Sequence, residues 1–491
     1  MQCSTTGVPL QKPPNDYHVE MHRSAFVLAI FTAALVQAQP PAPMRTIFAD
    51  KCAGCHGDRM QGGRAGSLLD DTWMYGGTDD KVLESIREGH ADAGMPSFKA
   101  TLSDIEVRGL LLLIRTNATQ AKGRPATLAT PVVDGIIKTA KQTFRIETLT
   151  DAIETPWGLA FLPDGRLLIT ERPGRLRILD KGKLSEPVSG IPTVWTRQDG
   201  GLFDVEVHPK YAQNGWIYLA YAEPRETNRS MTTIIRGRIK ENKWVDQETI
   251  YQAPDELFTQ INFHYGLRFI FDRDGYLYYS LGDHGKPESA QDLSQPTGKI
   301  HRVHDDGKIP KDNPFVNRAG ALGSIWSYGH RNPEGFSFAP NGTLWATEHG
   351  PAGGDEVNII QKGRNYGWPV ISWGLMDSGL PTETTAKPGM EQPVVHYEPS
   401  PGIAPVLFYN GTRYPNWKGN VFLGFMGHEE LRRLTVKGTQ VTGQEVLFKG
   451  LGRVRDIILG PDGFLYVALA NPGAQLSSTT QGRVVRLVPV P

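Results

Sequence analysis

The stretch Asp462-Gly463-Phe464-Leu465-Tyr466-Val467 decides the fold of the larger part of this chain. Asp-Gly is a tight-turn dipeptide, and the aromatic and branched residues that follow it favour a β-strand. The same turn-then-strand pattern occurs at five other places, which are 163–169, 214–219, 274–279, 341–346 and 418–423. Such units over about 350 residues give roughly 60 residues per unit, somewhat longer than the repeat of common β-propellers.

This array predicts an all-β propeller of six blades over residues 135–491. The irregular spacing of the strands indicates functional loops between them. We expect the final strand, 482–488, to pair with the first strands of the domain and close the ring. A large β-sandwich is the less favoured alternative.

Length and composition place this propeller in a multidomain protein without a strong charge bias. With 491 residues, the chain exceeds what a single ordinary core needs. Its 52 Lys and Arg balance its 52 Asp and Glu, which argues against binding of nucleic acid or anionic lipid. The 54 glycines and 36 prolines favour many turns and short strands.

Residues 1–38 resemble an export signal. His22 and Arg23 precede an apolar run at 25–36, which ends near small residues typical of a cleavage site. The run is too short to span a bilayer, and a buried core segment is the alternative. We expect Met21 to be the true start, the mature protein to be periplasmic or secreted, and no membrane span.

The motif Cys52-Ala53-Gly54-Cys55-His56 is the covalent attachment signature of a c-type haem. The thiols of Cys52 and Cys55 add to the haem vinyl groups, and His56 then becomes the proximal ligand of the iron. A thioredoxin-like redox pair would need a surrounding βαβ pattern, and a zinc site would need a second pair of ligands. Neither is present in the sequence, so haem c is the predicted cofactor.

The sixth iron ligand is expected to be Met95, which lies in a turn-like stretch at 94–98. His90 and Met60 are the competing ligands. Met60 is too close in sequence to His56 to reach the opposite face of the haem easily. His90 follows a predicted helix end, where a solvent-exposed histidine is common.

Two helices are predicted around this ligand loop. The first covers 78–88, and the second covers 104–115 and begins with a capping box made by Ser103 and Glu106. Motif and layout together make residues 41–116 resemble a small, all-α class I cytochrome c domain.

A linker is predicted between the two domains. Residues 116–131 are rich in Thr, Ala, Gly and Pro and show no hydrophobic period, so we assign 117–134 to the linker. If flexible, this segment spans roughly 20–25 Å on average.

The loops of the propeller carry six further motifs in one order. They lie at 154–161, 200–209, 329–335, 348–358, 365–369 and 453–456. In residues and order they resemble the PQQ-dependent glucose/sorbosone and aldose sugar dehydrogenase family. The resemblance implies a quinoprotein that oxidises the anomeric carbon of an aldose sugar with bound PQQ and Ca²⁺.

Sugar oxidation needs a base that takes the hydroxyl proton while hydride leaves for an electron sink. His264, within 263–268, matches the catalytic base of the family. By themselves His284, His304 and His349 are equal candidates, because a lone histidine is more often a structural group.

The resemblance also assigns the cofactor pocket. PQQ is a flat quinone with three carboxylates, so cationic side chains should surround it. Arg453 and Arg455 match the carboxylate-binding pair, and their spacing of two predicts a common direction on a strand, with an exposed arginine pair as the alternative. Arg331 matches the arginine that polarises the quinone carbonyl, with Asn332 beside it. Asp199 occupies the remaining catalytic position.

Calcium is implied at two places. The family holds a PQQ-bound Ca²⁺ on backbone carbonyls that correspond to Gly350 and Pro351. Asp355, Glu356 and Tyr366 match positions associated with a further, structural Ca²⁺. Oxygen ligands suit this hard cation, although a solvated acidic turn is an alternative for the acid pair.

The chain departs from the family pattern at Gly354, Asp199, Glu334 and Gly427. Relatives often have glutamine where Asp199 stands, and the adjacent Gln198 is a possible substitute. A basic residue that contacts the quinone is missing near Gly427, where His428 is the expected replacement.

Together these observations predict an oxidoreductase that passes electrons from a sugar to its own haem and then to an external acceptor. One alternative is a propeller without PQQ that serves as a binding or electron-transfer module. Another is a gluconolactonase-like hydrolase, which would need side-chain metal ligands and no haem. The fused cytochrome favours the redox enzyme, because an electron carrier is useful beside a redox reaction.

Overall fold

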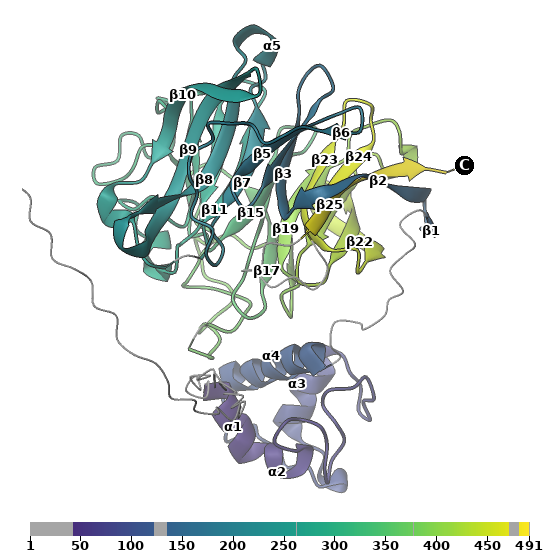
Figure 1. The fold of residues 1–491 in the computed structure, drawn as a ribbon. Helices are drawn as coiled ribbons and strands as arrows, with labels where there is room; N and C mark the ends of the chain where they lie inside the picture. The colour runs from purple at the N-terminus through teal and green to yellow at the C-terminus, as the bar shows by residue number, and fades with distance from the viewer. Residues whose placement is uncertain (1–42, 122–134, 262, 377, 471–480, 491) are drawn as a thin grey trace, which may run out of the picture. The chain divides into compact units, whose positions relative to one another are not determined.

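The computed structural model describes residues 43–121, 135–261, 263–376, 378–470 and 481–490 (Figure 1). The predicted export signal and the proposed start at Met21 lie outside these residues. None of the described helices has the length and apolar character needed to cross a membrane.

The N-terminal part is helical, as predicted. Its helices are α1 (Pro43–Lys51), α2 (Ala53–His56), α3 (Asp79–Glu88) and α4 (Asp104–Ala121), with a 3₁₀ turn at Ala91–Ala93. Helices α1 and α3 both pack against α4. The shared core includes Met44, Phe48, Val82, Ile86 and Leu110, which lie on the apolar faces of these helices.

The capping box at the start of α4 is confirmed. The Glu106 carboxylate accepts the Ser103 amide at 2.8 Å, and the Glu106 amide donates to the Ser103 hydroxyl at 3.3 Å. The predicted linker of 117–134 begins too early, because α4 continues to Ala121. Ala118 is buried there, so packing outweighs the polar composition on which the linker assignment rested.

The C-terminal part is a six-bladed β-propeller built from antiparallel sheets, which confirms the predicted fold. Its strands, blade by blade, are β3 (Pro156–Phe161), β4 (Leu167–Glu171), β5 (Arg175–Asp180), β6 (Lys183–Leu184); β7 (Leu202–Val207), β8 (Ile217–Arg225), β9 (Arg229–Lys240), β10 (Lys243–Gln252); β11 (Gly266–Phe271), β12 (Leu277–Leu281), β13 (Lys299–Val303), β14 (Ile325–Tyr328); β15 (Pro333–Phe338), β16 (Leu344–Glu348), β17 (Asp355–Ile360), β18 (Val395–Tyr397); β19 (Ile403–Phe408), β20 (Val421–Phe425), β21 (Glu430–Lys437), β22 (Gln440–Lys449); and β23 (Arg453–Leu459), β24 (Leu465–Ala470), β25 (Gln481–Pro489), β2 (Thr143–Glu154), β1 (Ile136–Lys138).

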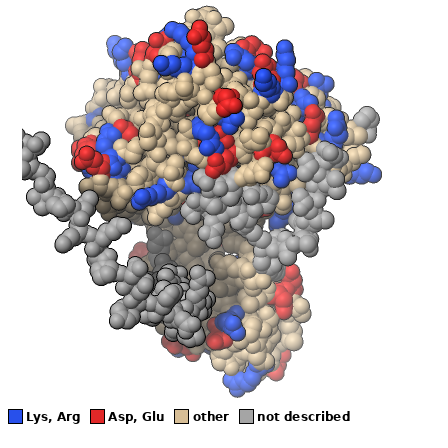
Figure 2. Space-filling model, viewed as in Figure 1, with Lys and Arg blue, Asp and Glu red and all other residues tan. Residues whose placement is uncertain are grey.

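The ring is formed by the first strand of each blade. Strand β3 contacts β7, the contacts continue through β11, β15, β19 and β23, and β23 returns to β3. Each predicted turn joins such an innermost strand to the second strand of its blade. Strand β25 lies between β24 and β2, so the C-terminal strand closes the ring against an N-terminal one, as predicted. In the view of Figure 1, the propeller surface shows acidic and basic side chains interspersed with one another (Figure 2).

All six innermost strands break their register near their first residues. The breaks lie between Pro156/Leu159, Leu202/Val205, Gly266/Phe269, Pro333/Gly335, Ile403/Val406 and Val454/Asp456. Such bulges interrupt the alternation of side chains and redirect them. The predicted site residues 199, 264, 331, 332 and 453 lie just before or at these starts, so one end of the ring collects them.

Candidate active site

His264 lies immediately before β11, in a backbone conformation that side chains rarely adopt. Its φ is +56°. The carbonyl oxygen of His264 lies so close to Gly282 that a Cβ added to this glycine would be 2.1 Å from it. Only glycine at position 282 allows this close approach. A strained residue that is held in this way is typical of a functional site.

The His264 ring is oriented by Asp283. Nδ1 of His264 lies 2.8 Å from one carboxylate oxygen of Asp283, and the Trp368 indole donates to the other oxygen at 2.8 Å. Burial opposes ionisation of Asp283, but the hydrogen bond from His264 and the charge of Arg331 keep its pKa below the ordinary value. An ionised Asp283 requires Nδ1 to donate, which leaves the lone pair on Nε2 for a substrate proton.

The other three candidate histidines are less suited to this role. His284 is buried with neither ring nitrogen bonded to a described residue, and burial lowers its pKa to about 4. Burial and the charge of Arg331 lower the pKa of His349 to about 3. His304 is exposed and contacts the ring of Tyr276.

Arg331 and Asn332 are fixed beside His264. The Arg331 amide donates to Glu348 at 2.9 Å, and its guanidinium lies 5.4 Å from the centre of the Trp368 ring. The Asn332 side-chain carbonyl accepts the amide of Gly266 at 2.8 Å. Arg331 lies over Trp368, and Trp368 and His264 bind the two oxygens of the same Asp283 carboxylate, so these side chains lie close together.

Arg453 and Arg455 lie at the start of β23, but the reason for their predicted common direction is wrong. A bulge at Arg455 breaks the alternation on which that prediction rested. Arg455 is buried, its pKa is lowered by burial, and its Nε has no hydrogen-bond partner among the residues described. Arg453 is half-buried and contacts the Met426 sulfur at 3.9 Å.

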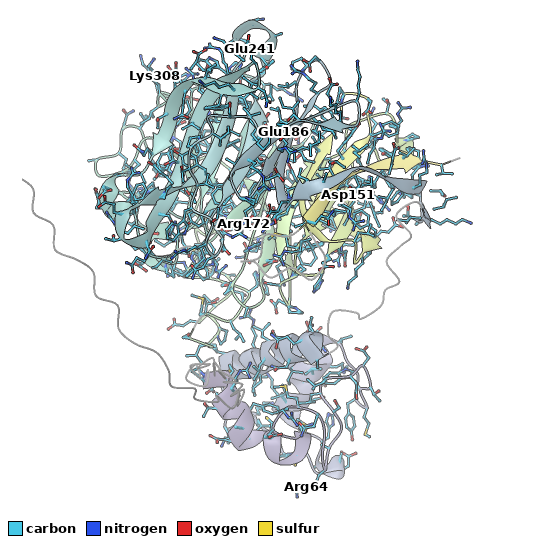
Figure 3. All side chains as sticks on the ribbon, viewed as in Figure 1. Arg64, Asp151, Arg172, Glu186, Glu241 and Lys308 are labelled. Atoms are coloured by element: carbon cyan, nitrogen blue, oxygen red, sulfur yellow. The ribbon has the colours of Figure 1, made fainter. Side chains whose placement is uncertain are left out.

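A further arginine, Arg172, belongs to this group (Figure 3). It follows β4, is buried, and donates Nε to the carbonyl of Gly200 at 2.9 Å. Burial and the neighbouring charge of Arg455 lower its pKa to about 10. The guanidinium of Arg172 also donates to the backbone carbonyls of Thr196 and Gln198, so Arg172 is held in place by the chain itself. The lowered pKa values of the buried Arg172 and Arg455 favour an anionic ligand, which the three carboxylates of PQQ would supply.

Asp199 and His428 stand at or beside positions where the chain departs from the family pattern. Asp199 is half-buried and interacts with the charges of Arg172 and Arg455, whereas Gln198 is exposed, and its predicted role as a substitute stays a prediction. His428 does not replace the missing base near Gly427. Burial, with Lys449 and Arg432 nearby, lowers the pKa of His428 to about 4, so it is neutral at pH 7.

The predicted carbonyl ligands for calcium line a small cavity. It measures about 10 Å³, the size of one water molecule, and its walls include Arg331, Gly350 and Pro351. The Asp355 carboxylate accepts the amides of Gly350 at 3.1 Å and Ile403 at 2.7 Å. Asp355 thus fixes the loop that presents the two carbonyls.

Glu356 and Tyr366 line the same cavity but differ in their availability. Burial and the neighbouring Glu348 raise the pKa of Glu356 to about 8, so a cation would relieve this repulsion. The Tyr366 hydroxyl is bonded to the backbone of Ile359 and Gln361. Glu356 therefore fits a cation, while the Tyr366 hydroxyl and the Asp355 carboxylate are committed to backbone groups.

The haem attachment motif is arranged for iron binding. Cys52 and Cys55 are free thiols: Cys52 caps the N-terminus of the short helix α2, and Cys55 lies within it. Burial and Cys55 raise the pKa of Cys52 to about 11, unlike the lowered pKa of a redox-active Cys-x-x-Cys thiol. Nδ1 of His56 lies 3.0 Å from the carbonyl of Gly66, which leaves Nε2 for the iron.

Met95 and its competitors differ in their contacts. Met95 is tied to His90 by two backbone hydrogen bonds of 2.9 and 3.0 Å and is partly buried against the domain core. The His90 ring lies 3.5 Å from the Tyr75 ring and its Nε2 lies 2.9 Å from the Ser85 hydroxyl. Met60 is buried in the core. These contacts favour Met95 as the sixth ligand, which stays a prediction.

We expect Met95→Ala to remove the weak charge-transfer absorbance of a thioether ligand and to lower the haem reduction potential, because methionine stabilises ferrous iron. Spectra and potentiometric titration of the holoprotein measure both quantities. The His90→Ala variant is the matched control and should keep the wild-type spectrum. If the control loses the band and Met95→Ala retains it, His90 is the ligand.

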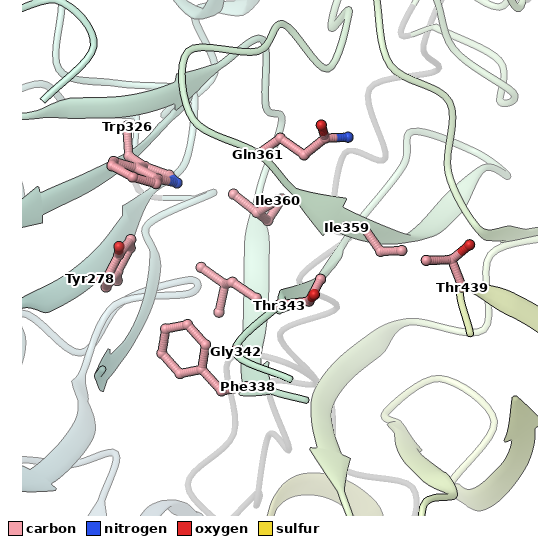
Figure 4. A pocket seen from close by; sticks show the side chains of 10 residues that line it. Tyr278, Trp326, Phe338, Gly342, Thr343, Ile359, Ile360, Gln361 and Thr439 are labelled. Atoms are coloured by element: carbon pink, nitrogen blue, oxygen red, sulfur yellow. The ribbon is translucent and has the colours of Figure 1, made fainter. Parts of the chain in front are cut away.

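A second and larger cavity, of about 420 Å³, opens near the other end of β15 (Figure 4). Tyr278, Trp326 and Phe338 line it together with Thr343 and Gln361. No predicted site residue lies in its wall, so we assign the chemistry to the end of the ring that carries His264.

Sequence reasoning missed several residues of this site. They are Asp283, Arg172, Arg268 and Trp368. The burial of Glu334 was not predicted either. Asp283 directly precedes His284 and follows a predicted strand, which is the one sequence signal that pointed to it. Burial and contact between blades identify the others, and neither is visible in a local pattern.

Known proteins resemble this chain in sequence and in structure. The family described as glucose/sorbosone dehydrogenase matches residues 153–478. Aldose sugar dehydrogenase YliI of Escherichia coli is 41% identical over 346 residues, which cover 69% of this chain and 93% of that protein. The soluble aldose sugar dehydrogenase structure from E. coli in its apo form has a TM-score of 0.65, is 39% identical, and covers 71% of this chain and 100% of that one.

A PQQ-bound aldose sugar dehydrogenase from Streptomyces coelicolor has a TM-score of 0.56, is 25% identical, and covers 71% of this chain and 98% of that one. A second family, described as cytochrome c oxidase, cbb3-type, subunit III, matches residues 39–113. The first family match covers more than half of the chain. It includes the predicted base His264, the arginine pair Arg453 and Arg455, and the predicted calcium loop. The chain therefore belongs to the glucose/sorbosone dehydrogenase family and joins its propeller to a cytochrome c domain.

Proposed function

We propose that this protein is a PQQ-dependent aldose sugar dehydrogenase that passes electrons from the sugar to its own haem c. The observation that carries the proposal is the His264–Asp283 pair beside a group of buried arginines. A base next to a pocket for an anionic electron acceptor is what oxidation of a sugar hydroxyl requires. The similarity to a PQQ-bound relative supports the choice of acceptor.

His264 acts as the base. Its Nε2 takes the proton of the anomeric hydroxyl, while Asp283 holds Nδ1 and stabilises the imidazolium that forms. Bound PQQ would supply the electron sink for the hydride of the anomeric carbon. The positive charge of Arg331 would stabilise the negative charge that this acceptor gains. Asn332 accepts the amide of Gly266 and so fixes the start of β11. This contact keeps His264 and Arg331 at a constant distance from each other.

The remaining residues hold the cofactor and its cation. Arg453 and Arg455, with Arg172, bind the carboxylates of PQQ. The carbonyls of Gly350 and Pro351 offer oxygen ligands to a Ca²⁺ that neutralises the cofactor, and Glu356 offers a carboxylate in the same cavity. Asp199 would lie among these cations, where relatives often have a neutral side chain. We propose further that the protein is exported to the periplasm or secreted, where its haem would reduce an external acceptor.

The test is reconstitution of the haem-loaded protein with PQQ and Ca²⁺, followed by addition of an aldose. We expect the absorbance bands of ferrous haem to appear only when quinone, cation and sugar are all present. A protein that binds PQQ but leaves its haem oxidised in every aldose would contradict the proposed electron path. Absence of PQQ binding would contradict the proposed enzyme.

A further inference from the structure

The bulges of the innermost strands create a ring of buried charges at the candidate site. Asp204, Arg268, Glu334 and Arg455 all lie within these register breaks. Arg268 connects them, because its guanidinium donates to the carbonyls of Glu334 at 3.1 Å and Arg455 at 3.0 Å. Arg268 also donates to the Asp204 carboxylate at 3.0 Å, so residues from four blades meet at one point.

Within this ring, Glu334 has an incomplete set of partners. One oxygen of its carboxyl group accepts the Asn332 amide at 2.9 Å. The other oxygen is buried and has no hydrogen-bond partner in the part of the chain that the structure describes. A buried carboxylate with an unsatisfied oxygen is costly, and a carboxyl group that carries a proton is much less so.

The arginines around Glu334 do not neutralise it fully. Arg268 is already paired with Asp204 at 3.0 Å and Asp456 at 3.2 Å. The positive charge of Arg455 lowers the pKa of Glu334. Among the described residues, however, Arg455 has no ion pair within 4.0 Å. Arg455 is also the residue expected to bind a carboxylate of PQQ. A bound anion would therefore compete with Glu334 for the same positive charge.

We propose that Glu334 carries a proton whenever PQQ is bound, so that above neutral pH the site takes up a proton with the cofactor. This inference rests on the proposed function. Because proton and ligand binding are linked, a tricarboxylate that favours neutral Glu334 binds more weakly once Glu334 has ionised. Glu334 is thus a positioning residue that sets cofactor affinity.

The charged groups that face Glu334 agree with this assignment. Burial raises the pKa of Glu334 to about 7 even though Arg455 and Arg268 lower it, and Asp199 raises it further. His349, which contacts Asn332, is neutral in this range. Strand β19, which packs on β15, contributes no titratable side chain. Burial raises the pKa of Asp204 to about 7 and also raises the pKa of Asp456. Both groups remain in the wild type and in a Glu334 variant, so the difference between the two proteins reports Glu334.

The experiment compares PQQ binding at saturating Ca²⁺ in the full-length protein and in Glu334→Gln. For a group with a pKa of about 7, the wild-type Kd should rise about tenfold from pH 6 to pH 8. In Glu334→Gln we expect a change of less than about threefold. Asp199→Asn is the matched control: it removes a charge that faces the same arginine and raises the pKa of Glu334, so it should tighten binding and keep a clear pH dependence whose rise in Kd begins at a lower pH.

A second measurement covers the case in which Glu334→Gln does not fold. Titration calorimetry of the wild type in two buffers of different ionisation enthalpy counts the protons taken up, and we expect a value approaching one at pH 8. A wild-type protein that binds PQQ equally at both pH values and takes up no proton would overturn the inference. Retention of the pH ratio in Glu334→Gln would overturn it as well. Absence of PQQ binding at any pH would instead contradict the proposed function.

Discussion

His264→Ala is expected to slow aldose oxidation by about 10²- to 10⁴-fold while PQQ remains bound, the range for loss of a general base. The reason is local: His264 presents Nε2 to the substrate, and His284 and His349 are buried with strongly lowered pKa values. PQQ-dependent turnover with an artificial acceptor, and PQQ affinity by fluorescence, measure the two quantities separately.

Two further variants test the same assignment, one within the site and one outside it. Asp283→Asn should also lower turnover without loss of PQQ, because an amide favours the tautomer with the proton on Nε2. His304→Ala is the matched control, since His304 is exposed and lies outside the site, and it should turn over sugar at the wild-type rate. Near-normal turnover by His264→Ala would exclude His264 as the base.

Haem reduction by sugar is expected to be first order and independent of protein concentration. Oxidation of one sugar releases two electrons, whereas a haem iron accepts one, so two single-electron transfers must follow each turnover. A tethered acceptor has an effective concentration in about the millimolar range, which is roughly 10³ times that of a micromolar free cytochrome. Stopped-flow mixing of oxidised, PQQ- and Ca²⁺-loaded protein with aldose measures the rate.

The control removes the haem and keeps the propeller. A Cys52→Ala, Cys55→Ala double variant should lose all covalently bound haem and yet retain sugar oxidation with an artificial acceptor. Haem reduction that accelerates in proportion to protein concentration would show transfer between molecules and leave the fusion without this role.

The propeller itself could be predicted because its signal is local and repeated. A turn such as 462–463 needs only its own residues to favour a tight reversal, and the strand that follows needs only its own branched and aromatic side chains. The haem motif is also local, since two thiols and a histidine must be adjacent in sequence to hold one haem. Ring closure by β25 followed from the rule that a propeller hides its edges.

Local composition failed where packing decided the structure. The residues after Arg115 resemble a linker in composition, but Asn117 donates to the Leu113 carbonyl at 2.7 Å and Ala118 is buried, so α4 continues. His428 looked like a replacement cation near Gly427. Its neutrality depends on burial and on Lys449 and Arg432, which a sequence pattern does not contain.

The sequence by itself determined the blade count and the haem attachment motif, because each depends on short motifs, and a resemblance carried by such motifs predicted His264 as the base. Only the tertiary structure decided what surrounds them. The alternation that predicts side-chain direction ends at a bulge, and the bulges at Glu334 and Arg455 lie on different blades. Arg268 of a third blade joins them. The burial of these side chains, and the interactions between charges on strands far apart in sequence, arise only when the ring closes. A local sequence pattern therefore cannot predict them.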